Sequence, residues 1–345
     1  MTAEIAIAIL AVFVLSLVLT AKVRAAALAQ GILDVPNERS SHQTPTPRAG
    51  GVAIVVATTL AVVAFAFLGT VSVELAAAVA GGGALVAIVG FVDDRKALSA
   101  RVRLAVHGIA ALWALLWLDG LPALGAGEQS AWGLALEYSL GVLGIVWTLN
   151  LFNFMDGIDG IAASEAAFVS CAGALLVLLT GGSIATPAIA LVLAAACLGF
   201  LRWNWPPARI FMGDVGSGYL GYVIAVLSIA ASNESSAMLP AWLILGGVFV
   251  VDATVTLVRR VLRGERPHEA HRTHAYQWLT RRWGSHRRVT VAVLVLDSFW
   301  LLPCALAAIV WADLAWFIVL PAFLPLVVLA IVAGAGRAEP VPRKE

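Results

Sequence analysis

Eleven long apolar segments constrain the fold of this chain more than any other feature. A helix that crosses a lipid bilayer needs about 20 mostly apolar residues. Here 61% of the 345 residues are hydrophobic and 12% are charged, whereas soluble domains are about half apolar and a quarter charged. The predicted spans cover residues 3–21, 51–69, 75–92, 104–122, 133–152, 161–180, 184–201, 217–232, 238–258, 289–311 and 314–334. We therefore predict an all-α polytopic membrane protein that forms a single domain over residues 1–345.

The basic residues predict how these spans are oriented. All 22 lysines and arginines lie in segments 22–50, 93–103, 202–217, 259–288 and 337–344. With eleven spans, these five segments share one face of the membrane. Because cytoplasmic loops carry an excess of Lys and Arg, we expect that face to be cytoplasmic, with the N-terminus outside and the C-terminus in the cytoplasm.

Residues 150–160 form a polar stretch between two of the apolar segments. Asn150, Asn153 and Asp156 recur every three residues, and Asp159 follows after another three. If the stretch is helical, these side chains lie near one face. Carboxylates at the edge of a membrane are costly and usually mark functional sites. The alternative is a polar turn that only joins two spans.

Three further carboxylates lie at the ends of predicted spans. Asp93 and Asp94 are adjacent, and such pairs repel unless a cation intervenes; Mg²⁺ is the usual cation, bound by one or two carboxylates and substrate phosphates. The alternative is an acidic helix end that Arg95 and Lys96 neutralise. Asp214 lies among glycines where a span begins, which is typical of a phosphate-binding helix start and equally of a simple N-cap.

Two basic clusters offer donors for an anionic ligand. Arg39 and Arg48 lie in a loop over residues 39–51 that contains two prolines and two glycines, although a solvated cytoplasmic loop would look similar. His268, His271 and His274 lie within seven residues among nine arginines. The histidine spacing suggests zinc, but the basic surroundings and the lack of a nearby Cys favour phosphate binding. A merely basic, lipid-facing loop is the alternative.

These clusters together predict phosphoryl transfer at the cytoplasmic face. The candidate active-site loops cover residues 22–50, 93–103, 153–160, 202–217 and 259–288. They supply carboxylates for Mg²⁺ and basic groups for phosphate, as such catalysis requires. Trp203 or Phe211 could stack on a nucleobase.

A multi-pass transporter or a flippase for a lipid-linked sugar is the alternative function. Transporters place polar groups near the middle of the membrane, often in repeated halves. Here the polar clusters lie at the ends of spans, although Asp252 and Asp297 lie inside them, and the sequence has no visible repeat. We expect Asp252 to form a structural pair with Arg259 or Arg260.

Several of these motifs resemble the polyprenyl-phosphate N-acetylhexosamine-1-phosphate transferases, which belong to glycosyltransferase family 4. The resemblance extends from about Arg39 to Gln277. Its motifs are Asp93-Asp94-Arg95, Asn153-Phe-Met-Asp156-Gly-Ile-Asp159-Gly, and Asn204 with Phe211-Met-Gly-Asp214-Val-Gly-Ser217. His271-Arg-Thr-His274 differs from the consecutive histidines of the muramoyl-pentapeptide translocases. It looks more like the branch that uses 6-deoxy-N-acetylhexosamine donors in O-antigen synthesis.

The resemblance implies a reaction and a cofactor. The enzyme would transfer an N-acetylhexosamine 1-phosphate from a UDP-sugar to undecaprenyl phosphate and release UMP, with Mg²⁺ (or Mn²⁺) as cofactor. The sugar would be GlcNAc or a 6-deoxy-HexNAc such as FucNAc or QuiNAc. The product would initiate O-antigen or another cell-envelope polysaccharide.

The resemblance also implies roles for individual residues. Asp214, Asn153 and Asp94 are the expected metal ligands. Asp159, Asn204 and Phe211 would hold the uridine. The expected catalytic groups are Asp93, Asp94, Asp156, His271 and His274, and Arg272 and Arg48 would bind substrate. We expect a bacterial inner-membrane enzyme, with a possible homodimer and no nucleic-acid partner.

Overall fold

A computed structural model describes residues 3–36, 44–121, 130–266 and 271–338, and most of them are helical. The helices in the first half are α1 (Ala3–Ala29), α2 (Gly51–Phe67), α3 (Val73–Asp93), α4 (Ala100–Trp117), α5 (Ala131–Met155), α6 (Ile161–Leu179) and α7 (Ala185–Asn204). Those in the second half are α8 (Asp214–Ser232), α9 (Met238–Leu245), α10 (Gly247–Leu262), α11 (Ala275–Trp283), α12 (His286–Leu296), α13 (Leu302–Val310) and α14 (Ala315–Ala333). A π-helical turn, Asp297–Leu301, joins α12 to α13, and a short 3-10 turn, Ala312–Leu314, precedes α14. Two short antiparallel strands, β1 (Leu33–Asp34) and β2 (Thr46–Pro47), pair after α1.

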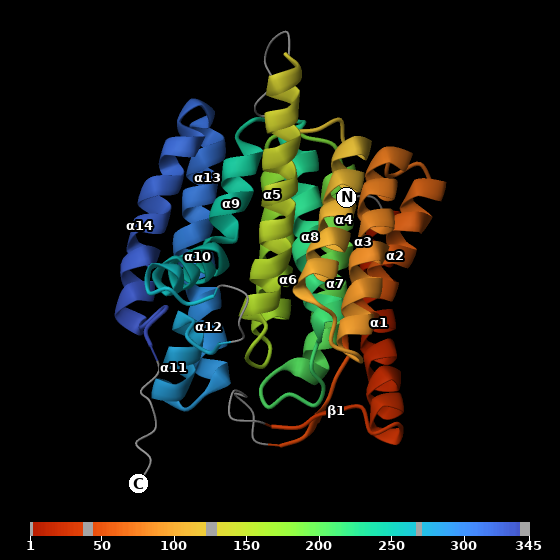
Figure 1. The fold of residues 1–345 in the computed structure, drawn as a ribbon. Helices are drawn as coiled ribbons and strands as arrows, with labels where there is room; N and C mark the ends of the chain where they lie inside the picture. Colours follow the sequence, from red (N-terminus) through yellow and green to blue (C-terminus); the bar gives the residue numbers. More distant parts are fainter. Residues whose placement is uncertain (1–2, 37–43, 122–129, 267–270, 339–345) are drawn as a thin grey trace.

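The prediction of an all-helical polytopic membrane protein is confirmed. Among the described residues, nine helical segments are long and apolar enough to cross a membrane. The pair α9 and α10 would make a tenth span, and α2 is an apolar helix of 17 residues. The predicted span 238–258 differs from the structure, because α9 and α10 are bent by 73° at Gly246. In Figure 1, α10 lies across the bundle instead of along it.

Many of the polar loops gather at one end of the helical bundle, the lower end in Figure 1. The strands β1 and β2, the turn between α5 and α6 and the loop between α7 and α8 all lie there, as do α11 and the start of α12. The C-terminal end of α3 belongs to the same end, because Asp94 contacts the start of α8. Except for the α5–α6 turn, which carries no basic residue, these segments are among those that the positions of Lys and Arg predicted to share one face.

Helix α8 forms the centre of the bundle, and 17 of its 19 residues are buried. Glycines let the neighbouring helices approach its backbone. A Cβ on Gly90 of α3 would lie 2.6 Å from the Asp214 carbonyl carbon, and one on Gly221 would lie 2.5 Å from the Thr148 carbonyl oxygen of α5. Gly51 of α2 faces Gly216 in the same way. Small residues of this kind allow close packing between membrane helices, and here they fix the N-terminus of α8 against three other helices.

Helix α11 is held against the bundle by the segment that follows α14. The Gly336 N–H donates to the Thr273 carbonyl oxygen (2.7 Å), and the Arg259 guanidinium donates to the Ala335 carbonyl oxygen (2.6 Å). Ala335 is completely buried. The end of α14 therefore secures both α10 and the loop that carries His271 and His274.

Candidate active site

An acidic pocket of about 210 Å³ opens at the loop end of the bundle. We call it the acidic pocket throughout. Its walls come from five parts of the chain: the β1–β2 region, the end of α5, the α7–α8 loop, α11 and α12. The lining residues are Asp34, Arg48, Asn153, Asp156, Gly157, Ile158, Asp159, Asn204, Phe211, Met212, Gly213, Asp214, Gln277 and His286. Seven of the predicted site residues therefore share one cavity.

Asp94 holds the N-terminus of α8 at the edge of this pocket. Its two carboxylate oxygens accept hydrogen bonds from the backbone N–H groups of Asp214 (3.0 Å) and Val215 (3.2 Å). A carboxylate is favourable at this position because the first N–H groups of a helix have no partner within the helix. Gly213 has a φ of +78°, and a Cβ there would lie 2.5 Å from an Asp94 oxygen. Asp94 thus fixes the position of the Asp214 backbone.

The side chain of Asp214 is linked to α5 and to α4. The Asn153 amide donates to Asp214 Oδ1 (2.9 Å) and to the Ser217 hydroxyl (3.2 Å). Arg103 Nη1 lies 3.7 Å from Asp214 Oδ2. The same guanidinium contacts Asp93 Oδ2 at 2.5 Å, and Asp93 also accepts from the Leu98 N–H. Asp93 is therefore bound within the fold, and Arg103 connects the two carboxylates.

The electrostatics of the acidic pocket favour a bound cation. Removal from water, and then the negative charges of Asp214, Asp94 and Asp159, raise the pKa of Asp156 well above its usual range, and only Arg48 acts in the opposite direction. Burial likewise raises the pKa of Asp94. A divalent cation would relieve this repulsion. Within the described residues, no three His, Cys, Asp or Glu side chains form a complete ligand cluster. Mg²⁺ commonly uses one or two carboxylates plus substrate phosphates, so the donors present fit it.

The opposite wall of the pocket is built around Asp159 and Asn204. Asp159 Oδ2 accepts from the Ala208 N–H (3.0 Å), and Oδ1 lies 3.2 Å from His286 Nδ1. Asn204 is buried; its carbonyl oxygen accepts from the Gly160 N–H and its amide donates to the Ile210 carbonyl oxygen, both at 2.9 Å. Asn204 therefore ties the loop after α5 to the loop before α8, and both of its polar groups already have partners.

The β1–β2 region brings Arg48 and Phe211 to the pocket. The Phe211 N–H donates to the Pro47 carbonyl oxygen (2.8 Å), and its own carbonyl oxygen accepts from the Gly50 N–H (2.9 Å). The Arg48 Nε atom lies 3.7 Å from Asp34 Oδ2. The strand β2 thus positions the α7–α8 loop and places a guanidinium at the rim of the acidic pocket.

The histidine segment, which we define as residues 271–274, lies beside the acidic pocket and does not line it. His274 is 2% exposed, its Nδ1 lies 3.3 Å from Asp252 Oδ1, and its ring stacks on His271 with centroids 4.9 Å apart. Asp252 also accepts from the N–H groups of Ala275 (2.8 Å) and Tyr276 (3.0 Å). Asp252 therefore caps α11, whereas the sequence led us to expect a pair with Arg259 or Arg260. Arg272 lines a separate, basic cavity.

A tyrosine joins the histidine segment to the acidic pocket. The Tyr276 hydroxyl donates to the Phe154 carbonyl oxygen (3.0 Å), and a Cβ on Gly157 would collide with that hydroxyl. Removal from water raises the pKa of Tyr276 well above its usual value, so the hydroxyl keeps its proton as donor. The start of α11 is thereby fixed to the loop that carries Asp156.

Sequence reasoning left out several residues that the structure places in the site or next to it, and among them four have polar contacts or line the pocket with a polar side chain. They are Arg103, Asp252, Gln277 and His286. Arg103 comes soon after Asp93 in the sequence, at the start of the next helix, and Gln277 comes soon after His274. This short distance along the chain from a predicted site residue was the signal that could have found them. Of the loop residues that suggested anion binding, Arg39 and His268 lie outside the described residues.

Comparison with known proteins identifies the family. Residues 76–232 match glycosyl transferase family 4. The chain is 30% identical over 323 residues to the probable undecaprenyl-phosphate N-acetylglucosaminyl 1-phosphate transferase of Bacillus subtilis, covering 90% of this chain and 87% of that protein. This chain belongs to glycosyl transferase family 4.

Other relatives agree with this assignment. The decaprenyl-phosphate N-acetylglucosaminephosphotransferase of Mycolicibacterium smegmatis is 31% identical over 326 residues, which cover 84% of this chain and 79% of that one. The phospho-N-acetylmuramoyl-pentapeptide-transferase of Chlamydia trachomatis is 37% identical over 131 residues, 37% of each chain. The family predicted from the motifs is therefore confirmed.

Proposed function

We propose that this protein transfers an N-acetylhexosamine 1-phosphate from a UDP-sugar to undecaprenyl phosphate and releases UMP. The main support is the acidic pocket, in which Asn153 and Asp156 from the end of α5 meet Asp214 of α8, with Asp94 of the α3 end beside them, at the loop end of a membrane bundle. The relatives that cover most of this chain are named for transfer of N-acetylglucosamine phosphate to a polyprenyl phosphate, and that is the reaction class that such a pocket would serve.

Asp214, with Asn153 and Asp156 beside it, would hold Mg²⁺ together with the diphosphate of the donor. Mn²⁺ could replace Mg²⁺, because both prefer oxygen ligands. The bound metal would neutralise the charge that develops on the transferred phosphoryl group. The role of Asp94 in this proposal is to hold the Asp214 backbone, since both of its oxygens accept N–H groups of α8.

The lipid phosphate would attack the β-phosphorus of the donor. A bond forms between a lipid phosphate oxygen and that phosphorus, and the bond from the phosphorus to the bridging oxygen breaks, so UMP leaves. Arg103 would contact the lipid phosphate, because its guanidinium lies between Asp93 and Asp214 and its side chain is 38% exposed. Asp93 would orient the lipid phosphate by fixing Arg103.

The remaining wall of the pocket would bind the nucleotide. Phe211 would stack on the uracil, and Asp159 with His286 would shape the pocket around the ribose. Arg48 at the rim, with His271, His274 and Arg272 on the neighbouring segment, would attract and orient the diphosphate. The donor would be UDP-GlcNAc or a 6-deoxy-HexNAc analogue, and the product would start an O-antigen or another envelope polysaccharide at the inner membrane.

Purified protein tests this proposal directly. With Mg²⁺, undecaprenyl phosphate and a panel of UDP-N-acetylhexosamines, we expect release of UMP with at least one donor. Asp214→Asn should lose most of that activity while still inserting into the membrane. Asp313→Asn is the matched control, because Asp313 lies in the short turn before α14, outside the acidic pocket. No UMP release from any donor would refute the proposal, and full activity of Asp214→Asn would remove Asp214 from the site.

A further inference from the structure

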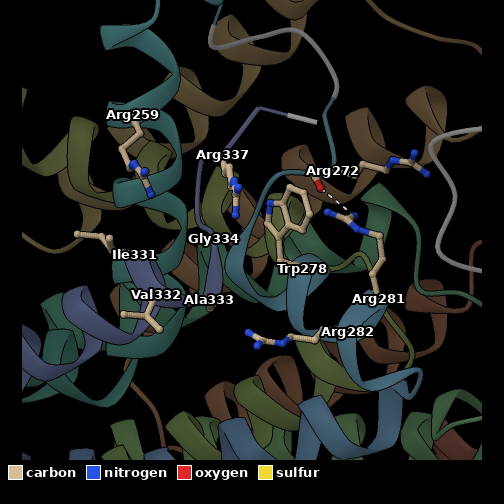
Figure 2. Close-up of a pocket in the computed structure, with 10 residues that line it drawn as sticks. All are labelled: Arg259, Arg272, Trp278, Arg281, Arg282, Ile331, Val332, Ala333, Gly334 and Arg337. Atoms are coloured by element: carbon tan, nitrogen blue, oxygen red, sulfur yellow. Dashed lines mark hydrogen bonds between the residues drawn. The ribbon is translucent and has the colours of Figure 1, made fainter. Parts of the chain in front are cut away.

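A second, basic cavity lies between α10, α11 and the end of α14, and it shares no lining residue with the acidic pocket. We call it the arginine cavity; its volume is about 860 Å³. Five arginines line it: Arg259, Arg272, Arg281, Arg282 and Arg337. Figure 2 shows Trp278 in the middle of the group, with Arg337 on one side and Arg281 on the other, whereas the Arg272 guanidinium extends away from the ring.

The polar side chains that line this cavity can donate hydrogen bonds but cannot accept them. Among the lining residues that the structure describes there is no Asp or Glu, and guanidinium and indole groups are donors only. The Trp278 Nε1 atom is buried and has no hydrogen-bond partner in the described part of the chain. A buried donor without an acceptor is costly. A ligand rich in acceptor oxygens and negative charge would satisfy it.

The other wall of the cavity is apolar and belongs to a predicted membrane span. Ile331 and Val332, in the last turn of α14, are 48% and 72% exposed. A ligand in this cavity would therefore meet arginines at one end and the lipid-facing surface of α14 at the other. That combination suits a phospholipid, whose phosphate would bind the arginines while its acyl chains stay against α14.

We propose that the arginine cavity binds the phosphate headgroup of an anionic bilayer phospholipid. The headgroup would bridge Arg337, which follows α14, and Arg282 of α11. It would also accept from Trp278, whose ring packs against Gly334. This lipid would reinforce the contact between the segment after α14 and the Thr273 carbonyl oxygen. The histidine segment would then be more firmly held in membranes that contain anionic lipid.

The test compares two pairs of arginines. Arg282→Gln/Arg337→Gln removes two charges from the cavity without touching the side chains of Arg259 and Arg281, which hold the segments around α11 by hydrogen bonds. Arg287→Gln/Arg288→Gln removes two charges from the first turn of α12, outside the cavity lining. Thermal unfolding is measured for wild type and both variants in detergent, with phosphatidylglycerol or with phosphatidylcholine of the same acyl chains.

We expect phosphatidylglycerol to raise the unfolding midpoint of the wild type and of the α12 variant above the values in phosphatidylcholine. The cavity variant should lose that increment, and its apparent affinity for phosphatidylglycerol should fall by about an order of magnitude. All three proteins should unfold at the same temperature in phosphatidylcholine. That result would show that the cavity variant folds like the wild type.

Three results would overturn the proposal. The first is an equal phosphatidylglycerol increment in all three proteins. The second is the same loss in both variants, because it would reflect total charge only. The third is an equal increment from inorganic phosphate without lipid that the cavity variant loses, because the site would then bind a free anion. None of these readouts requires transferase activity, so the lipid site and the proposed reaction can fail separately.

Discussion

Replacing Asp252 by Asn should loosen α11 and lower transferase activity through His274. The Asp252 carboxylate accepts from two backbone N–H groups at the start of α11 and from His274 Nδ1. Asn keeps one acceptor oxygen and puts an NH₂ group in place of the other, so at least one of these donors loses its partner. A hydrogen bond to a charged group contributes about 1.5–3 kcal/mol. A loss of about 2 kcal/mol corresponds to a factor of about 30 in an equilibrium constant.

Hydrogen–deuterium exchange measures this change where it should occur. Backbone amides of α11 should exchange about 30-fold faster in Asp252→Asn, because exchange there reports the local opening free energy. Amides in α13, which packs against α9 and α14, should not change. Unaltered exchange in α11 would refute the reasoning, because the cap would then contribute nothing.

A double-variant cycle tests whether Asp252 acts through His274. If it does, the double variant Asp252→Asn/His274→Ala should have the same UMP-release activity as His274→Ala alone. Effects of residues that act together do not add. Effects that multiply in the double variant would show that Asp252 serves activity in some other way, such as general stability.

Three further predictions concern the acidic pocket and the helix that carries it. Arg103→Gln should lower UMP release at least tenfold and Arg103→Lys should restore part of it, because the Arg103 guanidinium, which lies between Asp93 and Asp214, would bind the lipid phosphate. Equal activity of wild type and Arg103→Gln would contradict this role. Gly90→Ala should destabilise the protein by about 1–3 kcal/mol in denaturant or thermal unfolding, since its Cβ would lie 2.6 Å from the Asp214 backbone; Gly108→Ala on α4 is the control, because a Cβ at that position would have no neighbouring atom within 4 Å in the described part of the chain. Chelation with EDTA should abolish UMP release and added Mg²⁺ should restore it, whereas activity that survives EDTA would argue against a metal in the pocket.

The sequence predicted the helices well because their apolar length is a local property. Every predicted span corresponds to a helix or a pair of helices in the structure. The bend at Gly246 was missed because α9 and α10 together read as one apolar run. Helix α11 was missed because its strongly basic sequence looked like a loop, and it depends on a cap from Asp252 that lies in another helix.

The candidate site was predictable in its residue types and only partly in its contacts. The motifs named Asp94 and Asp214, but no periodicity relates two residues on different helices, so the cap of α8 could not be foreseen. The same reason hid the pair of Asp93 with Arg103 and that of Asp159 with His286. The motifs placed Asn204 against the nucleotide, whereas the structure shows both of its polar groups engaged with backbone.

The contact between the segment after α14 and the histidine segment has a practical consequence for handling this protein. A truncation after Ala333 would look harmless, because it removes only residues beyond the last span. It would delete Ala335 and Gly336, whose backbone groups bind Arg259 and Thr273. We expect such a shortened protein to insert normally and to be defective near His271 and His274. Affinity tags are therefore better placed at the N-terminus, and a C-terminal fusion should retain the full chain to residue 345.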